Sequence, residues 1–241
     1  MGPRPKSAAY IAAHIRRVLK DGGSAPHSEE LQRFFKETVR ARGWYTRELR
    51  RFAAAFRRPI LEHRGLPFLI EVADKLFAGR VLEEKNMAVL LLEKSAAKFG
   101  DAEFKLFGRW IDRVTNWAEH DALAHYLIGP LVLANPRRAA VLPRWARSRN
   151  RWRRRAAAVA LIHAARHKRL REWIVEVADL LLADRDEMVQ KGVAWLLREW
   201  VKFDRKPAVA YVRSIRRRAP RLVLRTACET LPPRTRAAML T

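Results

Sequence analysis

Trp117 and Asp121 lie four residues apart near the start of a predicted helix, so their side chains share one face of it. Asn116 and Glu119 have the spacing of a capping box at that start, and His125 follows Asp121 by one turn. An aspartate in a first turn is ordinarily a favourable partner of the helix dipole. On a surface that binds a polyanion, however, a carboxylate has little place unless it pairs with arginine or does chemistry. The neighbouring tryptophan keeps a chemical role for Asp121 open.

Trp195 is a second aromatic side chain in an unusual place. In the predicted helix over 187–203, the apolar residues fall on one face and Trp195 lies roughly opposite them. Lys191 and Arg198 lie about one turn away on either side of it. An aromatic ring between two cations is typical of a nucleic-acid contact. A tryptophan buried against a further layer of helices is the other interpretation, and the sequence leaves both open.

The segment 137–171 is the strongest charge signal. Its thirty-five residues contain thirteen Lys or Arg and no Asp or Glu, in a chain whose net charge is +25. Four arginines surround Trp152 where a helix is predicted to begin, namely Arg151, Arg153, Arg154 and Arg155. So much like charge favours a polyanionic partner, and nucleic acid fits better than an anionic membrane surface. A solvated face in an arginine-rich chain is the alternative.

The elements that must position these residues are predicted to be helical throughout. Apolar residues recur at spacings of three and four, and alternating strand patterns are absent. The predicted helices span about 8–20, 28–42, 46–57, 67–78, 82–98, 101–113, 116–128, 136–148, 151–167, 170–183, 187–203, 207–218 and 220–229. Since no Gly/Ser-rich linker interrupts them, we expect a single domain over 1–241, with the helices of about 8–57 capping the stack.

An internal repeat indicates how the helices stack. Residues 70–74 and 175–179 have matching sequences at an offset of 105, and the match continues through Leu76/Leu181 and Leu91/Leu196. Two helix pairs with one pattern favour a HEAT-like solenoid. We therefore expect an all-α, curved superhelical solenoid of antiparallel HEAT-like helical pairs with a concave basic groove. A compact bundle without repeats is the alternative.

Several classes of protein and site are disfavoured. The opening residues 1–5 precede no apolar segment, which argues against a signal peptide, and no apolar run approaches the ~20 residues of a membrane span. One cysteine, Cys228, excludes an intramolecular disulfide framework. The histidines have no metal-site spacing supported by acids, and no Gly-rich phosphate loop is present. We expect a cytoplasmic, nucleoid-associated bacterial protein without a metal or cofactor.

Three segments resemble a known family. Residues 110–121 contain a Trp-x-x-x-Asp pattern, residues 142–157 a Pro-basic-Trp followed by Trp-x-x-Arg-Ala-Ala, and residues 189–199 a Gln-Lys-x-x-x-Trp-x-Leu-Arg-Glu pattern. In this order and spacing they resemble the AlkD-type DNA alkylation repair glycosylases, which are built from HEAT-like repeats. The resemblance covers roughly residues 30 to 215. Two positions depart from the family pattern: Phe34 stands where a Tyr is common, and Arg47 where a turn has Pro.

The resemblance implies a monofunctional glycosylase that releases N3- or N7-alkylated, cationic purines from duplex DNA. Asp121 would stabilise the sugar cation and direct a water, while Trp117 and Trp195 would pack against the lesion nucleotide. The implied DNA contacts are Arg155, Arg154, Arg151, Trp152, Lys191, Arg198 and Phe34. The partner would be double-stranded DNA, bound by a monomer without an obligate protein partner. Two alternatives stay open: a non-catalytic protein that binds damaged or branched DNA, and a helical scaffold for an acidic protein.

Overall fold

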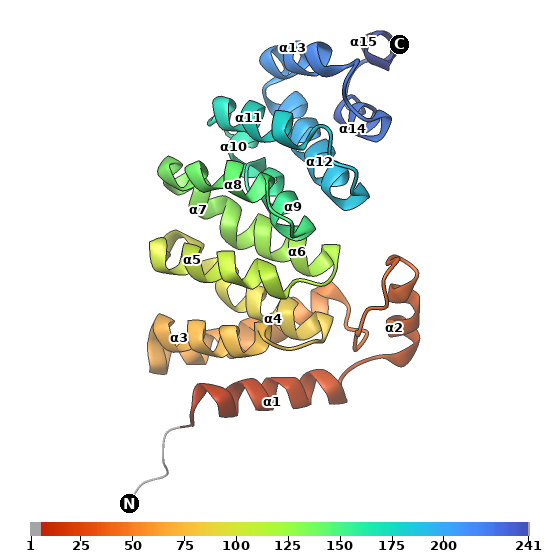
Figure 1. Cartoon of the computed structure of the whole chain (residues 1–241). Coiled ribbons are helices and arrows are strands. Elements are labelled where there is room, and N and C mark those ends of the chain that lie inside the picture. The colour runs from red at the N-terminus through yellow and green to blue at the C-terminus, as the bar shows by residue number, and fades with distance from the viewer. Residues whose placement is uncertain (1–5, 241) are drawn as a thin grey trace, which may run out of the picture. The chain divides into compact units, whose positions relative to one another are not determined.

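The computed structural model describes residues 6–240, and these contain helices and no strand. The all-α prediction is therefore confirmed (Figure 1). Residues 1–5, on which the argument against a signal peptide depends, lie outside the described residues. Within residues 6–240 no helix combines the length and apolar character that crossing a membrane requires. Contacts divide the chain into two compact units, which are described in turn.

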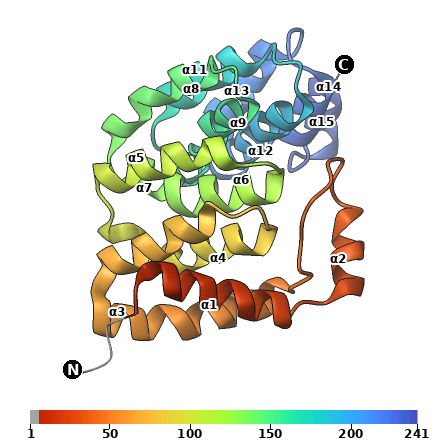
Figure 2. The same ribbon diagram turned by 60° about the horizontal axis from the view of Figure 1, so that its bottom comes forward.

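The first unit contains the chain up to Lys98 together with Arg113–Leu123. Its helices are α1 (Ala8–Asp21), α2 (Ala25–Gln32), α3 (Thr46–Phe77), α4 (Leu82–Leu92), the 3₁₀-helix η1 (Glu93–Lys98) and α6 (Trp117–Leu123). α3 packs along α4, and α1 packs on α3, as the turned view shows (Figure 2). The core between α3 and α4 contains fully buried apolar side chains, among them Leu69, Val72, Leu76, Met87 and Leu91.

The second unit contains Phe99–Asp112 and the chain from Ala124 onward. Its α-helices are α5 (Asp101–Trp110), α7 (Gly129–Ala134), α8 (Leu142–Ala146), α9 (Arg151–Val159), α10 (Ile162–Arg166), α11 (Arg171–Leu181), α12 (Glu187–Phe203), α13 (Arg205–Ile215), α14 (Arg221–Ala227) and α15 (Pro233–Leu240). Two shorter elements complete it, the π-helix η3 (Ala124–Ile128) and the 3₁₀-helix η4 (Pro136–Val141); a further 3₁₀ turn, η2 (Ile111–Arg113), follows α5. α12 packs against α9, α10, α13 and α14.

Each copy of the sequence repeat lies on two helices that pack together, one pair in each unit. In the first unit the repeat lies on α3 and α4, and in the second it lies on α11 and α12, which also pack together. Leu76 and its counterpart Leu181 are both buried, as are Leu91 and Leu196. The repeat therefore records a shared pattern of core positions. Its assignment to the HEAT type, the curvature and the single-domain organisation stay predictions.

A helix was predicted over 28–42, and that prediction is wrong for residues 33–42, which with residues 43–45 form a non-helical segment. The helix ends at Gln32, whose side-chain amide donates to the carbonyls of Phe35 and Glu37 and accepts from the N–H of Val39. Further on, the Glu83 carboxylate accepts the N–H of Arg42 and of Gly43, each at 2.8 Å. Side chains thus satisfy backbone groups that a helix would have paired, and the segment is non-helical.

Three other boundaries differ from the prediction. The break expected between residues 57 and 67 is present as a kink at Gly65 (φ 75°, ψ 178°) inside α3, so the first helix runs on past residue 57 to that kink. The helix expected to end near 128 continues through the π turn η3 into α7, where Pro130 lies at the first turn and needs no N–H partner. α15 was not predicted at all, although Pro233 is well suited to a first helical position.

Candidate functional site

The start of α6 is capped by Asn116. Its side-chain oxygen accepts the N–H groups of Ala118 and Glu119, each at 3.1 Å, which confirms half of the predicted capping box. The other half is different, because the Glu119 carboxylate accepts the N–H of Thr115 at 2.9 Å rather than that of Asn116. The cap therefore fixes where α6 begins, and it leaves Glu119 engaged with groups outside the helix.

Glu119 forms a buried ion pair with Lys85 of α4. Lys85 Nζ lies 2.8 Å from Glu119 Oε2, and the two side chains are 2% and 1% exposed. Lys85 Nζ also donates to the Arg113 carbonyl at 2.5 Å. Removing one partner of such a pair leaves an uncompensated buried charge, which costs about 3–5 kcal/mol. The pair thus ties α6 and the turn before it to α4, and it holds the first turn of α6 in one orientation.

Trp117, in that first turn, is oriented by the non-helical segment after α2. Its ring is nearly parallel to the ring of Phe35, with centroids 5.1 Å apart and planes inclined by 20°. Its Nε1–H donates to the Phe34 carbonyl at 3.3 Å. The Phe34 side chain itself is 67% exposed. Phe34 and Trp117, both predicted to contact the lesion-bearing DNA, therefore lie side by side in the first unit.

Asp121 is partly exposed and is positioned by its neighbour in sequence. Its Oδ1 lies 2.7 Å from Nδ1 of His120, a side chain that is fully buried, while 20% of the Asp121 side chain is exposed. Because an ionised carboxylate can only accept, Nδ1–H of His120 donates. This hydrogen bond fixes the direction of the carboxylate. A π turn, η3, begins three residues later, and π turns are frequent at functional sites.

Trp195, in the second unit, is half-buried, whereas the apolar stripe of α12 is fully buried as predicted. Its ring packs against His125 with centroids 5.4 Å apart, and His125 stacks on His163 at 4.5 Å. The indole Nε1 is buried, and it has no hydrogen-bond partner within residues 6–240. A buried polar group left unpaired is uncommon. Trp195 thus forms the end of an aromatic stack with one donor unsatisfied.

His163 belongs to this stack, and sequence reasoning missed it. Its Nε2 lies 2.9 Å from the carbonyl oxygen of His125, to which it donates. Burial lowers the pKa of the His163 imidazole, with Arg166 and His167 lowering it further, because desolvation disfavours the charged ring. The contact joins residues thirty-eight positions apart in the chain, so only the packing of η3 against α10 could reveal it.

Arg155 is a buried residue of the packing between α9 and α12. Arg155 is 5% exposed, and its Nη1 donates to the Met188 carbonyl. A Cβ added to Gly192 would stand 3.0 Å from Arg155 Cγ, so the glycine is what lets α12 approach this side chain. Trp152, on the same helix, is also buried, at 6% exposure, and the Arg151 guanidinium lies over its ring at 4.6 Å.

The other predicted basic contacts, and Arg153 beside them, are paired with acids, Lys191 within its own helix and the arginines with acids from other segments. The N–O distances are 3.6 Å for Arg151–Asp186, 2.6 Å for Arg153–Asp112, 2.6 Å for Arg154–Asp184, 2.9 Å for Lys191–Glu187 and 3.1 Å for Arg198–Glu229. The Arg153 guanidinium holds the pKa of the Asp112 carboxyl below its usual range. A run without acids in sequence is therefore not without acids in space.

Each unit thus assembles its own subset of the predicted residues. The first brings Phe34, Trp117 and Asp121 together around the start of α6. The second contains Arg151, Trp152, Arg154, Arg155, Lys191, Trp195 and Arg198 on α9 and α12. Their roles toward DNA stay predictions. Among residues 6–240, no group of three or more His, Cys, Asp or Glu side chains is arranged to hold a metal ion.

Comparison with known proteins identifies the family and the fold. A family model described as DNA alkylation repair enzyme matches residues 15–231. A solved structure called a predicted DNA alkylation repair enzyme from Enterococcus faecalis superimposes with a TM-score of 0.62. The two chains are 15% identical, and the match covers 97% of this chain and 98% of the other, so the likeness concerns the fold. No curated protein matches the chain.

Proposed function

The chain belongs to the DNA alkylation repair enzyme family, and we propose that it is a monofunctional DNA glycosylase that hydrolyses the N-glycosidic bond of N3- or N7-alkylated purines in duplex DNA. Membership supports a role in the repair of alkylation damage. The observation that carries the finer proposal is the Asp121 carboxylate, which is partly exposed, directed by the buried His120 and four residues from Trp117 on α6. On a chain with net charge +25, a carboxylate that faced a polyanion would be unfavourable unless it had a chemical role.

The chemistry asks little of the protein. Alkylation at N3 or N7 makes the purine cationic, so the base leaves without a general acid when the bond from its nitrogen to the sugar C1′ breaks. The bonding electron pair stays on the base and neutralises it. The sugar becomes an oxocarbenium-like cation, which a nearby carboxylate stabilises. Asp121 would also orient the water whose oxygen bonds to C1′ and would accept its proton.

The remaining residues would bind and orient the substrate. Trp117, fixed by Phe35 and by the Phe34 carbonyl, would present its ring to the lesion-bearing strand. Trp195 would contact DNA from the second unit through the ring that ends the histidine stack. We propose no lyase step, since Lys85, the lysine bound near α6, is buried in its pair with Glu119. The protein would act as a monomer without a cofactor.

The first test is base release from a duplex that contains a single 7-methylguanine. We expect free 7-methylguanine and an abasic strand that breaks only after alkali, with and without a chelator of divalent cations. Strand breakage without alkali would contradict the monofunctional assignment. Tight duplex binding without release of 7-methylguanine or of an N3-alkylated adenine would favour the alternative, a non-catalytic protein that binds damaged or branched DNA.

A further inference from the structure

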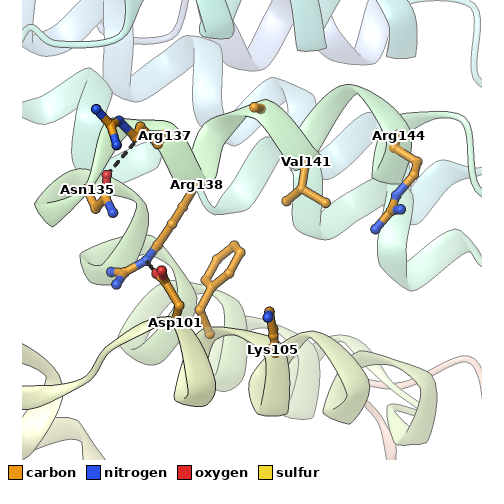
Figure 3. A pocket seen from close by; sticks show the side chains of 9 residues that line it. Asp101, Lys105, Asn135, Arg137, Arg138, Val141 and Arg144 are labelled. Atoms are coloured by element: carbon orange, nitrogen blue, oxygen red, sulfur yellow. Dashed lines mark hydrogen bonds and ion pairs between the residues drawn. The ribbon is translucent and has the colours of Figure 1, made fainter.

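A basic groove lies in the second unit between α5 on one side and η4 and α8 on the other. It consists of a hollow of about 640 Å³ and an adjoining one of about 290 Å³, which share Phe104, Lys105, Val141 and Arg144 in their linings. Figure 3 shows Lys105 on one wall, and Val141 and Arg144 on the other, directed towards the space between them. None of the residues proposed to contact the lesion lines it.

Two stacked aromatic rings form the floor of this groove. Phe104 of α5 and Trp145 of α8 are nearly parallel, with centroids 5.9 Å apart and planes inclined by 14°, and both are buried. A Cβ on Gly108 would be 3.4 Å from the Trp145 ring, so the glycine lets α5 and α8 approach closely. Because these rings are covered, the floor offers no surface on which a base could stack, and a ligand would contact the walls.

The walls carry an excess of unpaired cations. Four exposed basic side chains that line the groove have no ion-pair partner within residues 6–240, and these are Lys105, Arg109, Arg137 and Arg144. Two other arginines are neutralised, Arg138 by Asp101 at 2.7 Å and Arg153 by Asp112 at 2.6 Å. This differs from α9 and α12, where the exposed cations considered above pair with acids. Four like charges held together in an open groove favour an anionic ligand.

The arrangement of the four cations favours an extended polyanion over a small anion. Lys105 and Arg109 lie one turn apart on one face of α5, which separates them by about 6 Å along the axis. Arg137 and Arg144 lie on the opposite wall, on η4 and α8. The charges thus follow the length of the groove rather than converge on one point. Arginine forks suit phosphate oxygens, and evenly placed phosphates are the anions of a DNA backbone.

We propose that this groove binds the sugar–phosphate backbone of duplex DNA, independently of base identity and of the residues that act on the lesion. Its cations contact phosphates, and the covered aromatic floor makes the contact insensitive to sequence. The groove would hold the protein on undamaged DNA, while the residues of α6 and α12 act on the damaged nucleotide. The inference does not require that the glycosylase assignment be correct, because binding to undamaged DNA is measured without catalysis.

The test is the salt dependence of binding to a short undamaged duplex, followed by fluorescence anisotropy. In the variant Lys105→Ala/Arg109→Ala/Arg137→Ala/Arg144→Ala, the slope of log K against log salt should become shallower by up to about 3.6, since each phosphate contact contributes about 0.9. The matched control is Arg17→Ala/Lys20→Ala/Arg51→Ala/Arg80→Ala, which removes the same charge from exposed sites in the first unit. An equal change in both variants would show a net-charge effect and overturn the proposal.

Two further measurements complete the test. The charge-retaining variant Lys105→Arg/Arg109→Lys/Arg137→Lys/Arg144→Lys should keep the wild-type slope, which would assign the change in the alanine variant to its lost charges. The groove variant should bind polyglutamate no differently from the wild type; an equal loss for polyglutamate and DNA would assign the groove to an acidic protein instead. If the glycosylase proposal holds, base release at saturating protein should also be unchanged, and a slower rate would place these residues at the lesion.

Discussion

A charged side chain is partly exposed at the start of α6, whereas one is buried where α9 packs on α12. Asp121, on α6, keeps a fifth of its side chain exposed and is directed by a hydrogen bond from the buried His120. Arg155, on α9, is buried and donates to the Met188 carbonyl of α12. In the sequence, both residues belong to short patterns that contain a tryptophan. One charge is therefore left accessible at the surface, whereas the other is engaged by the protein itself.

The same difference separates the two kinds of basic residue in the second unit. The arginines of α9 that crowd Trp152 in sequence find acids on segments up to forty-one positions away, as Arg153 does with Asp112. Four cations on α5, η4 and α8 have no such partner within residues 6–240, namely Lys105, Arg109, Arg137 and Arg144, whereas Arg138 of η4 pairs with Asp101. Exposed ion pairs contribute little to stability, but they lower the field that a polyanion meets. The charge of the run 137–171 therefore does not show which of its arginines are left unpaired; in the structure Arg137 and Arg144 are, and Arg153 and Arg154 are not.

The largest expected effect concerns Asp121. Asp121→Asn should lower the single-turnover rate of 7-methylguanine release by about 10²–10³-fold, because the amide cannot stabilise the sugar cation as a charge does. DNA binding should be unchanged or tighter, since a negative charge facing phosphates is removed. Asp112→Asn, which alters an exposed carboxylate paired with Arg153, is the matched control and should leave the rate unchanged. Equal rates in wild type and Asp121→Asn would move the catalytic role elsewhere.

Some features of the fold and of the candidate site could be predicted from the sequence, and others could not. The bounds of α12 and the Asn116 cap follow from local patterns, and both were predicted. The fate of residues 33–45 was not, because it depends on Glu83, forty positions away from the Gly43 N–H that it accepts. The partners of Arg154 and Glu119 are likewise set by packing between helices. Local propensity and capping are encoded in short windows, whereas long-range ion pairs are not.

The next largest effect concerns Arg155. Arg155→Ala should lower the free energy of unfolding by about 2–4 kcal/mol, since it removes a buried side chain and leaves the Met188 carbonyl without this donor. Urea unfolding measures it. If Arg155 instead holds a phosphate, the slope of log K against log salt should become shallower by about 0.9. An unchanged slope together with a large stability loss would make Arg155 a structural residue.

A smaller effect tests the close approach of α12 to Arg155. Gly192→Ala should destabilise the wild type by about 1 kcal/mol, because the new Cβ would stand 3.0 Å from Arg155 Cγ. In the Arg155→Ala background the contact is gone, and the same change should stabilise by about 0.5–1 kcal/mol through helix propensity. The double-mutant cycle in urea reports this coupling. Additive effects of the two substitutions would show that Gly192 does not set the packing around Arg155.

The smallest effect concerns the histidine stack beside Trp195, which gives the second unit a pH dependence. Burial lowers the pKa of His163 in the folded protein, so the unfolded chain binds the proton more readily. The stability that His163 contributes is therefore fully present above the unfolded pKa of about 6.5, and it is lost as the pH falls below that value towards the folded pKa.

His163→Gln removes the titration and retains an amide that can donate to the His125 carbonyl. Its stability, followed by urea unfolding between about pH 7 and pH 5, should fall less steeply than that of the wild type. Parallel curves would mean that other groups govern the acid sensitivity and that the stack beside Trp195 tolerates a charged ring.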